Sequence, residues 1–215
     1  MRRILLALLL SAAPLCPGCG CTNWLGYVFA PASPTRTVHP DPAIPSLKGQ
    51  TLAVVIYAPP QVQMDYDTAQ LELSEEISAE FGRRLDGARL VDSRRILRYQ
   101  DENLNWDAMP PGRLARPLGA DYVLLVNLHE FTTREPGSVH LARGRITADA
   151  ALYDDEGPGC LEPRWRSGRI GVVFPEETPV GVPARSDAVV RAETERLFAA
   201  KLVRHFYEHE VPKQP

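Results

Sequence analysis

The side chains that could carry out acid–base chemistry are a pair of histidines and a neighbouring glutamate. His129 and Glu130 are adjacent at the end of an apolar run, and His140 follows soon after. Adjacent residues of a strand point to opposite faces, so we expect that His129 and Glu130 do not form a dyad. His140 could approach His129 from a neighbouring strand. We expect partly exposed polar residues here and no catalytic residue, with a hydrolase that uses His129 or His140 as a minor hypothesis.

Two further groups have residue types that bind metals. Asp154, Asp155 and Glu156 offer carboxylate oxygens, but they lack the spaced ligands of a calcium loop and are typical of a solvated turn. His205 and His209 are four residues apart, which on a helix can hold a metal. Because carboxylates flank them, we expect a polar helix end instead. We predict no metal and no cofactor, since phosphate-binding glycine loops and nucleophile motifs are also missing from the sequence.

Three cysteines follow an apolar run at the amino terminus. They are Cys16, Cys19 and Cys21, and the only other cysteine is Cys160, so the second ligand pair of a zinc site is missing. Two arginines precede the run Ile4–Leu10, which is typical of a secretory signal. The run is too short for a permanent transmembrane helix, which needs about 20 residues.

The cysteine that follows Gly18 resembles the lipid-attachment site of a bacterial lipoprotein signal. Such a signal is cut before a cysteine that then carries lipid. We therefore predict a signal peptide over residues 1–18 and lipid on Cys19. Cleavage after Gly20, with lipid on Cys21, is a second possible position. Ordinary cleavage after Ala13 is the alternative.

We expect a tether between the lipid and the folded domain, over residues 19–48. Its later part is rich in proline and is typical of an extended linker. The aromatic cluster Trp24–Phe29 could rest in the membrane interface or pack on the domain core. Once the signal is removed, Cys21 and Cys160 could form a disulfide in an exported compartment, or remain two free thiols.

Residues 49–210 have the pattern of a single α/β domain. Strands are expected at 51–57, 88–92, 120–131, 139–153 and 164–174, and helices at 69–85, from 93, at 113–118 and from 187 to about 208. A break of alternation near Gly144 predicts a bulge or a bend. The inward face of the last helix is expected to carry Val189, Val190, Leu197, Phe198, Leu202 and Phe206.

The order β-α-β-α-β-β-β-α predicts a mixed-sheet sandwich of the α/β class. Early strands joined through helices should pair in parallel through right-handed crossovers, and the later strands should pair antiparallel, with helices packed on this one sheet. The net charge of −3 and the pI near 6.0 give no sign of a nucleic-acid interface.

Four phrases of the sequence are similar to one superfamily of bacterial envelope proteins. They are LAVVIY (52–57), LVDSRRI (90–96), LGADYVLLVNL (118–128) and RGRITADAALYD (143–154). The superfamily holds the amino-terminal domain of TolB, the curli-secretion channel lipoprotein and lipoprotein activators of penicillin-binding proteins. The resemblance covers about residues 50–206 and implies a fold rather than an activity.

The sequence departs from these relatives in two ways. An insertion over 155–163, which contains Cys160, replaces their tight turn. The two strands around it carry Arg143, Arg145, Arg166 and Arg169, which argue against contact with lipid, so we expect a solvated sheet.

Together these features predict an exported, lipid-anchored binding or scaffold protein, and not an enzyme. It would face the periplasm, attach to the membrane through its anchor, bind another envelope protein and bind no nucleic acid. Sheet edges and the proline-rich stretch 175–183 are the expected contact surfaces. The alternative is an oligomeric subunit of an envelope secretion or transport assembly, so a homo-oligomer is a further expectation.

Overall fold

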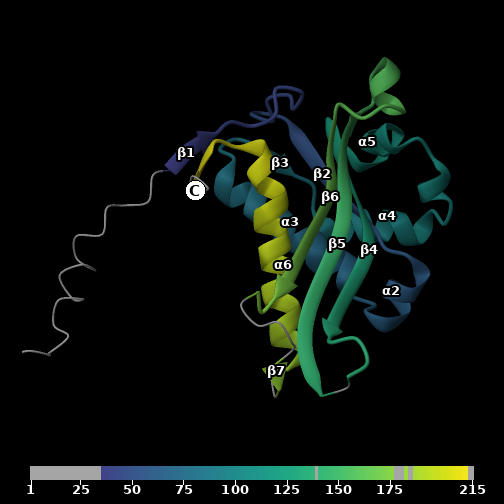
Figure 1. Cartoon of the computed structure of the whole chain (residues 1–215). Coiled ribbons are helices and arrows are strands. Elements are labelled where there is room, and N and C mark those ends of the chain that lie inside the picture. The colour runs from purple at the N-terminus through teal and green to yellow at the C-terminus, as the bar shows by residue number, and fades with distance from the viewer. Residues whose placement is uncertain (1–34, 139, 177–181, 184–185, 213–215) are drawn as a thin grey trace, which may run out of the picture. The chain divides into compact units, whose positions relative to one another are not determined.

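The computed structural model of the chain describes residues 35–138, 140–176, 182–183 and 186–212 (Figure 1). The predicted signal peptide, Cys19, Cys21 and Trp24–Phe29 lie outside the described residues. The chain forms two compact units, residues 37–210 and residues 1–36 with 211–215. Of the smaller unit, only residues 35–36 and 211–212 are described. No helix in the described ranges combines the length and apolar character needed to cross a membrane.

A mixed sheet forms the centre of the larger unit. Five strands follow the order β3-β2-β4-β5-β6, and the short β7 pairs with β5. Their bounds are β2 (Thr51–Tyr57), β3 (Arg89–Leu90), β4 (Tyr122–Arg134), β5 (Leu141–Asp154), β6 (Trp165–Phe174) and β7 (Val182–Pro183). β2 is parallel to β3 and β4, whereas β4, β5 and β6 are antiparallel. The expected mixed α/β fold is therefore confirmed.

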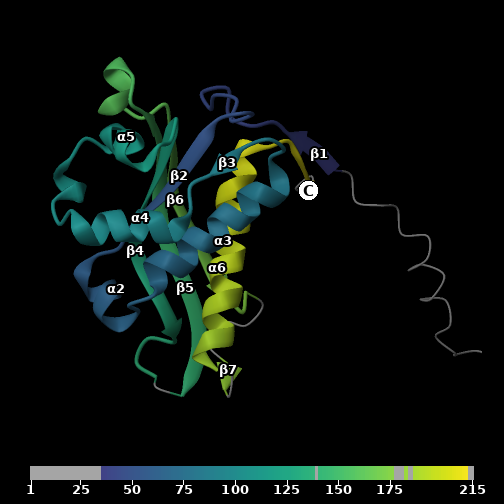
Figure 2. The ribbon, with the colours of Figure 1, turned by 180° about the vertical axis from the view of Figure 1, so that it is seen from behind.

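Helices lie on both faces of the sheet, which makes three layers (Figures 1 and 2). On one face α3 (Ala69–Arg84) packs on Leu52, Val54 and Ile56 of β2, and α6 (Asp187–Val203) packs on β5 and β6 beside it. On the other face α4 (Ser93–Glu102) and α5 (Ala115–Leu118) pack on Ala53 and Val55. The unbroken apolar run of β2 follows from this arrangement, because both of its faces are buried.

Shorter elements connect these layers. A helix α2 (Pro60–Asp65) precedes α3, and the 3-10 helices are η1 (Trp106–Ala108), η2 (Pro111–Leu114), η3 (Gly157–Cys160) and η4 (Arg204–Phe206). Strands β1 (Thr35–Val38) and β8 (His209–Pro212) form a separate two-stranded sheet. Leu47 belongs to the buried core, so core packing includes a residue just before the expected domain start.

The last helix is shorter than the sequence suggested. The sequence offers Ser186 or Asp187 as the cap of this helix, and Ser186 is the cap, since its hydroxyl accepts a hydrogen bond from the Val189 amide. The helix ends at Val203 and not near residue 208. Val189 is 49% exposed, so its expected inward position was wrong, whereas Val190, Phe198, Leu202 and Phe206 are buried.

The bulge expected near Gly144 is confirmed. Between the pairs Thr132↔Arg145 and Arg134↔Ala142, two residues of β5 lie opposite one residue of β4. A second shift follows the pair Leu128↔Ala148, where His129 is the extra residue of β4. Each bulge places an additional side chain on one strand without a matching residue on its neighbour.

Candidate functional site

A hollow lies where the parallel strand β2 ends beside the middle of β4. The chain leaves β2 for α3 on one face of the sheet, and leaves β3 for α4 on the other face. Open α/β sheets bind ligands at such a reversal of strand order. The hollow measures about 220 Å³, and its lining residues are Tyr57, Trp106, Asp107, Leu125 and Asn127.

Two aromatic rings form one wall of this hollow. Tyr57 ends β2, and Trp106 begins η1 after α4. Their ring centroids are 6.1 Å apart at an interplanar angle of 62°, an edge-to-face arrangement that stabilises aromatic pairs. The Asp107 and Asn127 side chains supply polar groups beside this apolar wall.

From Asn127 a hydrogen-bonded group of side chains continues along the sheet. Asn127 Nδ2 donates to Asp149 Oδ2 at 3.1 Å, and His129 Nε2 forms a short contact with Asp149 Oδ1. Arg169 of β6 lies opposite Asp149 in the strand register. We call this surface the polar sheet face and define it by Asn127, His129, Glu130, Thr147, Asp149 and Arg169.

The expectation that His129 and Glu130 point to opposite faces of the sheet was wrong, and the bulge at His129 is the reason. His129 contacts Asp149, and Glu130 accepts a hydrogen bond from Thr147 Oγ1 at 3.3 Å. Thr147 and Asp149 are two residues apart on one strand, so they share a face. His129 and Glu130 therefore also share a face, because the extra residue shifts the alternation of β4 by one position.

The polar sheet face provides donors and acceptors rather than an assembled nucleophile. The His129 and Asp149 side chains are each 38% exposed, which leaves the imidazole accessible to a partner. Within the described ranges, no serine, threonine or cysteine side chain forms a hydrogen bond with His129. A Ser–His–Asp type arrangement requires that third contact.

The second histidine of the hydrolase hypothesis lies elsewhere. His140 immediately precedes β5 and is exposed, and its backbone amide donates to Ser138 Oγ at 3.3 Å. The register places that end of β5 opposite Arg134, several residues beyond His129. The structure does not bring the two histidines together.

The histidine pair at the carboxyl end lacks the helical spacing expected for it. His205 lies in η4 and His209 in β8, because α6 has already ended. His205 packs against Trp165 with ring centroids 5.4 Å apart. Burial is the main cause that lowers the pKa of His205, which favours the neutral ring at this position.

The carboxylates at the end of β5 and just after it form ion pairs with arginines of the folded unit. Asp154 Oδ2 accepts from Arg164 Nε at 2.6 Å, and Asp155 pairs with Arg116. Asp121, at the same end of the sheet, accepts from the Thr51 amide at 2.7 Å. Over the described parts of the chain, no group of three or more His, Cys, Asp or Glu side chains could hold a metal ion.

Cys160, in the insertion after β5, is a free and buried thiol. Arg113 Nε donates to its Sγ at 3.2 Å. Cys21 lies outside the described residues, so the pairing of these two cysteines stays a prediction.

One notable residue escaped the sequence analysis. Glu195 is only 5% exposed on α6, where it lines a groove toward α3. Phe198, Ala199 and Leu202, the residues at its i+3, i+4 and i+7 positions, are all buried. A glutamate in register with that buried stripe was the signal in the sequence that could have revealed it.

The chain matches no protein-family model and no curated protein. It is similar to the crystal structure of lipoprotein GNA1162 from Neisseria meningitidis, with 15% identity and a TM-score of 0.45 over 71% of this chain and 95% of that chain. It is similar to the PelC dodecamer from Paraburkholderia phytofirmans, with 13% identity and a TM-score of 0.40 over 80% and 97%.

A putative lipoprotein from Caulobacter crescentus has 12% identity and a TM-score of 0.38 over 70% of this chain and 83% of that chain. All three TM-scores are below 0.5, so these similarities carry no conclusion about function or assembly. The superfamily resemblance seen in the sequence stays a prediction.

Proposed function

We propose that this chain is an exported, lipid-anchored binding protein that holds another protein of the cell envelope, and not an enzyme. The observation that carries the proposal is the polar sheet face, where hydrogen-bonded side chains are accessible at the surface. Helices α4 and α5 pack on β2 and the start of β4, and His129, Glu130 and Arg169 beyond them are exposed.

The side chains of this surface are held in place before any partner arrives. Asp149 fixes both Asn127 and His129, and Glu130 is bonded to Thr147. Immobilising a free polar side chain at an interface costs about 0.5–1.5 kcal/mol, and pre-ordering removes part of that cost. An ordered polar surface of this kind therefore suits specific binding.

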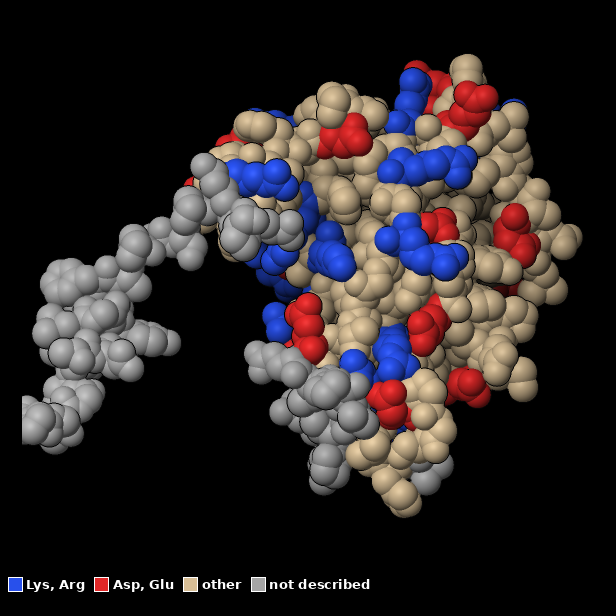
Figure 3. All heavy atoms as spheres, viewed as in Figure 1, with Lys and Arg blue, Asp and Glu red and all other residues tan. Residues whose placement is uncertain are grey.

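Charges of both signs accompany the polar sheet face. Figure 3 shows basic side chains along β5 and β6 with acidic ones between them. At the far end of β4, Glu135 pairs with Arg145 at 2.9 Å and with Arg143 at 3.4 Å. Mixed charges select a complementary partner rather than any surface of one sign.

The proposal is tested by site-specific photo-crosslinking in cells that make the full chain. A crosslinking residue replaces Arg169, on the polar sheet face, or Arg196, which lies on α6 and is 59% exposed. We expect one discrete crosslinked protein from Arg169 and none from Arg196. The Asp149→Ala variant removes the acceptor of Asn127 and His129, and should reduce the Arg169 crosslink about tenfold.

Three results would contradict this assignment. They are equal crosslinking from Arg169 and Arg196, no crosslinked protein from Arg169, and a yield that Asp149→Ala leaves unchanged. The Glu193→Ala variant is the matched control, since Glu193 is bonded to Arg196 on the outer side of α6.

The edge of the sheet favours a second candidate, self-association into an assembly. Among the described strands, β6 is one of the two outer strands of the path β3-β2-β4-β5-β6. Lys201 Nζ donates to the Gly171 carbonyl at 2.8 Å, which occupies one acceptor of β6. Edge strands with free backbone groups can pair with another copy. Ring-sized particles in detergent that disappear in a Val173→Pro variant would favour this candidate, because the backbone of Val173 points to the same edge as that of Gly171.

A further inference from the structure

A groove runs between α3 and α6, on the opposite side of the sheet from the polar sheet face. It measures about 440 Å³ and contains four glutamates, of which Glu72, Glu75 and Glu76 lie on α3 and Glu195 on α6. The lining includes one basic residue, Arg191, and three alanines. Four carboxylates against one guanidinium give the lining an excess of acidic groups.

Helical periodicity and small side chains create this groove. The α3 lining residues are at positions 72, 75, 76 and 79, and the α6 lining residues are at 188, 191, 192 and 195. Both sets have the i, i+3, i+4, i+7 spacing of one helix face. The two helices run in the same direction, because Thr68 contacts Arg191 at one end and Phe81 contacts Phe206 at the other.

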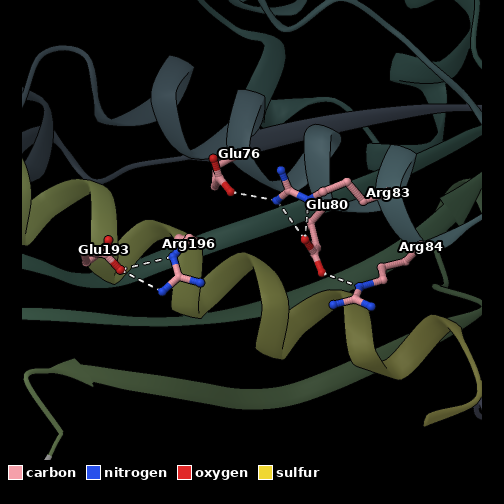
Figure 4. A network of polar contacts seen from close by, with 6 residues as sticks. All are labelled: Glu76, Glu80, Arg83, Arg84, Glu193 and Arg196. Carbon is pink, nitrogen blue, oxygen red and sulfur yellow. Dashed lines mark hydrogen bonds and ion pairs between the residues drawn. The ribbon is translucent and has the colours of Figure 1, made fainter.

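The α3 glutamates of the groove each have an arginine partner. Arg191 Nε lies 3.1 Å from Glu72 Oε2, and Arg94 Nε lies 3.4 Å from Glu75 Oε1. Arg83 lies 3.0 Å from Glu76, and Figure 4 shows it bridging Glu76 and Glu80 on α3. The arginines around the groove are therefore already engaged.

Glu195 differs from these three glutamates. It is 5% exposed, and its Oε1 atom is buried without a hydrogen-bond partner in the described part of the chain. A buried acceptor without a partner is destabilising, because it has lost its hydrogen bonds to water and gained none in the protein. Burial first, and the neighbouring Glu72 second, raise the pKa of Glu195 to about 8.

We propose that the α3–α6 groove binds an arginine side chain of a protein partner, with its guanidinium directed at Glu195. The three alanines offer apolar contact for the aliphatic stem, and long basic side chains bury such stems along apolar surface. The planar guanidinium has five donors, enough to satisfy Glu195 and to reach a second carboxylate of the groove.

Binding of the guanidinium is coupled to the loss of a proton. Glu195 faces Glu72 and Glu76 of α3 and Arg191 of α6. A cation stabilises the carboxylate form, so an arriving arginine releases the proton of Glu195. The affinity should therefore increase as the pH rises from 6 to 8.5.

The test uses the full mature chain in detergent and two short peptides. One peptide has a central arginine, and the other has the neutral isostere citrulline. We expect saturable binding of the arginine peptide and at least tenfold weaker binding of the citrulline peptide. The Glu195→Gln variant should bind the arginine peptide at least tenfold more weakly at pH 8.5, and its affinity should not change between pH 6 and 8.5.

Glu193→Gln is the matched control, because it removes the same charge from α6 outside the groove lining. We expect less than a twofold effect from it. Ala192→Leu keeps Glu195 and fills the groove, so it should also abolish binding if Glu195→Gln fails to fold. Equal binding of both peptides, equal losses in Glu193→Gln and Glu195→Gln, or no binding by the native chain would each overturn the proposal.

This groove is separate from the polar sheet face, so the two assignments can fail independently. Loss of arginine binding in Ala192→Leu should leave the Arg169 crosslink unchanged. Conversely, Asp149→Ala should leave arginine binding unchanged.

Discussion

Glu80 and Glu195 show how neighbouring side chains decide whether the pKa of a buried carboxyl group is lowered or raised. Both are 5% exposed on helices that pack together. Burial acts to raise the pKa of Glu80, but hydrogen bonds from Arg84 and Arg83 outweigh it and the pKa is lowered. Glu195 lacks such a partner in the described part of the chain, and its pKa is raised to about 8.

The raised pKa of Glu195 predicts that part of the stability is lost as the pH rises from about 5 to about 8. The folded state keeps the proton up to about pH 8, whereas a glutamate of the unfolded chain, with its ordinary pKa of 4.5, releases it at a much lower pH. The contribution is therefore fully present below that value and is lost as the pH rises through the folded pKa. We expect the free energy of unfolding to fall by about 3 kcal/mol from pH 5 to pH 8 through this group.

Urea unfolding of the native chain and of Glu195→Gln, at pH 5, 6.5 and 8, measures this contribution. The native chain should lose stability relative to the variant at each step. Other groups titrate equally in both proteins, so only the difference between the two curves is compared. Parallel curves would show that Glu195 does not carry the effect.

Removing the charge of Glu80 should destabilise the fold. In Figure 4, Glu80 is bonded to Arg83 and Arg84, at 2.8 and 2.9 Å. The Glu80→Gln variant weakens both hydrogen bonds in a buried setting, and we expect a loss of about 2 kcal/mol.

The Glu193–Arg196 pair in the same figure is the control for Glu80. These side chains are 39% and 59% exposed, and such surface pairs contribute little. Glu193→Gln should therefore change the free energy of unfolding by less than about 0.5 kcal/mol. Similar losses in both variants would argue against a special role of the Glu80 network.

At the scale of elements, α6 approaches the sheet closely because β5 has a glycine beneath it. A Cβ at Gly144 would overlap the Thr194 hydroxyl and lie 2.9 Å from Thr194 Cβ. Thr194 itself is held, since its hydroxyl donates to the Val190 carbonyl at 2.6 Å. The bulge at Gly144 thus coincides with the contact between strand and helix.

We expect Gly144→Ala to destabilise the chain by about 2 kcal/mol, because the added methyl group overpacks this contact. Gly171→Ala is the matched control on β6, where the new Cβ would meet Thr147 Oγ1 at an ordinary 3.8 Å. Thermal unfolding followed by circular dichroism compares the two. Adding Thr194→Ala to the Gly144→Ala variant should restore part of the lost stability. Equal stability of the Gly144→Ala and Gly171→Ala variants would contradict this account.

The bulge at His129 has a comparable effect on the other face of the sheet. It places His129 and Glu130 on one surface, next to Asp149 and Thr147. Strict alternation of β4 would have separated them. The composition of the polar sheet face therefore depends on one inserted residue in the strand.

At the scale of the whole molecule, the anchor and the folded unit have different tasks in the proposal. The predicted lipid on Cys19 would fix the location, and the folded unit would present its two binding surfaces. Residues 19–34 of the tether remain a sequence-based prediction, since residues 1–34 lie outside the described residues, whereas Thr35–Val38 form β1 and Leu47 packs in the core.

Intact mass of the protein extracted from membranes tests the anchor. We expect a mature chain that begins at Cys19 and carries added acyl mass. The Cys19→Ala variant should lose this mass and leave the membrane fraction. An unmodified chain beginning after Ala13 would instead indicate a soluble exported protein. Cys16, Cys19 and Cys21 would then all remain, and disulfide or metal binding by them would need new consideration.

Much of the fold could be predicted from the sequence. The bounds of β2 were predicted correctly, because an apolar run of β-branched residues is typical of a strand buried on both faces. The start of α6 was predicted to within one residue, from Ser186 or Asp187 as its cap, since a capping side chain acts within a few residues of the chain. These features depend on local interactions, which short stretches of sequence contain.

The sequence by itself determined the order of the elements and the mixed α/β class, because periodicity and caps are local properties. Only the tertiary structure decided which polar side chains meet. The contact of His129 with Asp149 required a bulge and a strand register, and the burial of Glu195 required α3 and α6 to lie side by side. Such contacts join residues far apart in the chain, and their geometry depends on packing that no single segment specifies.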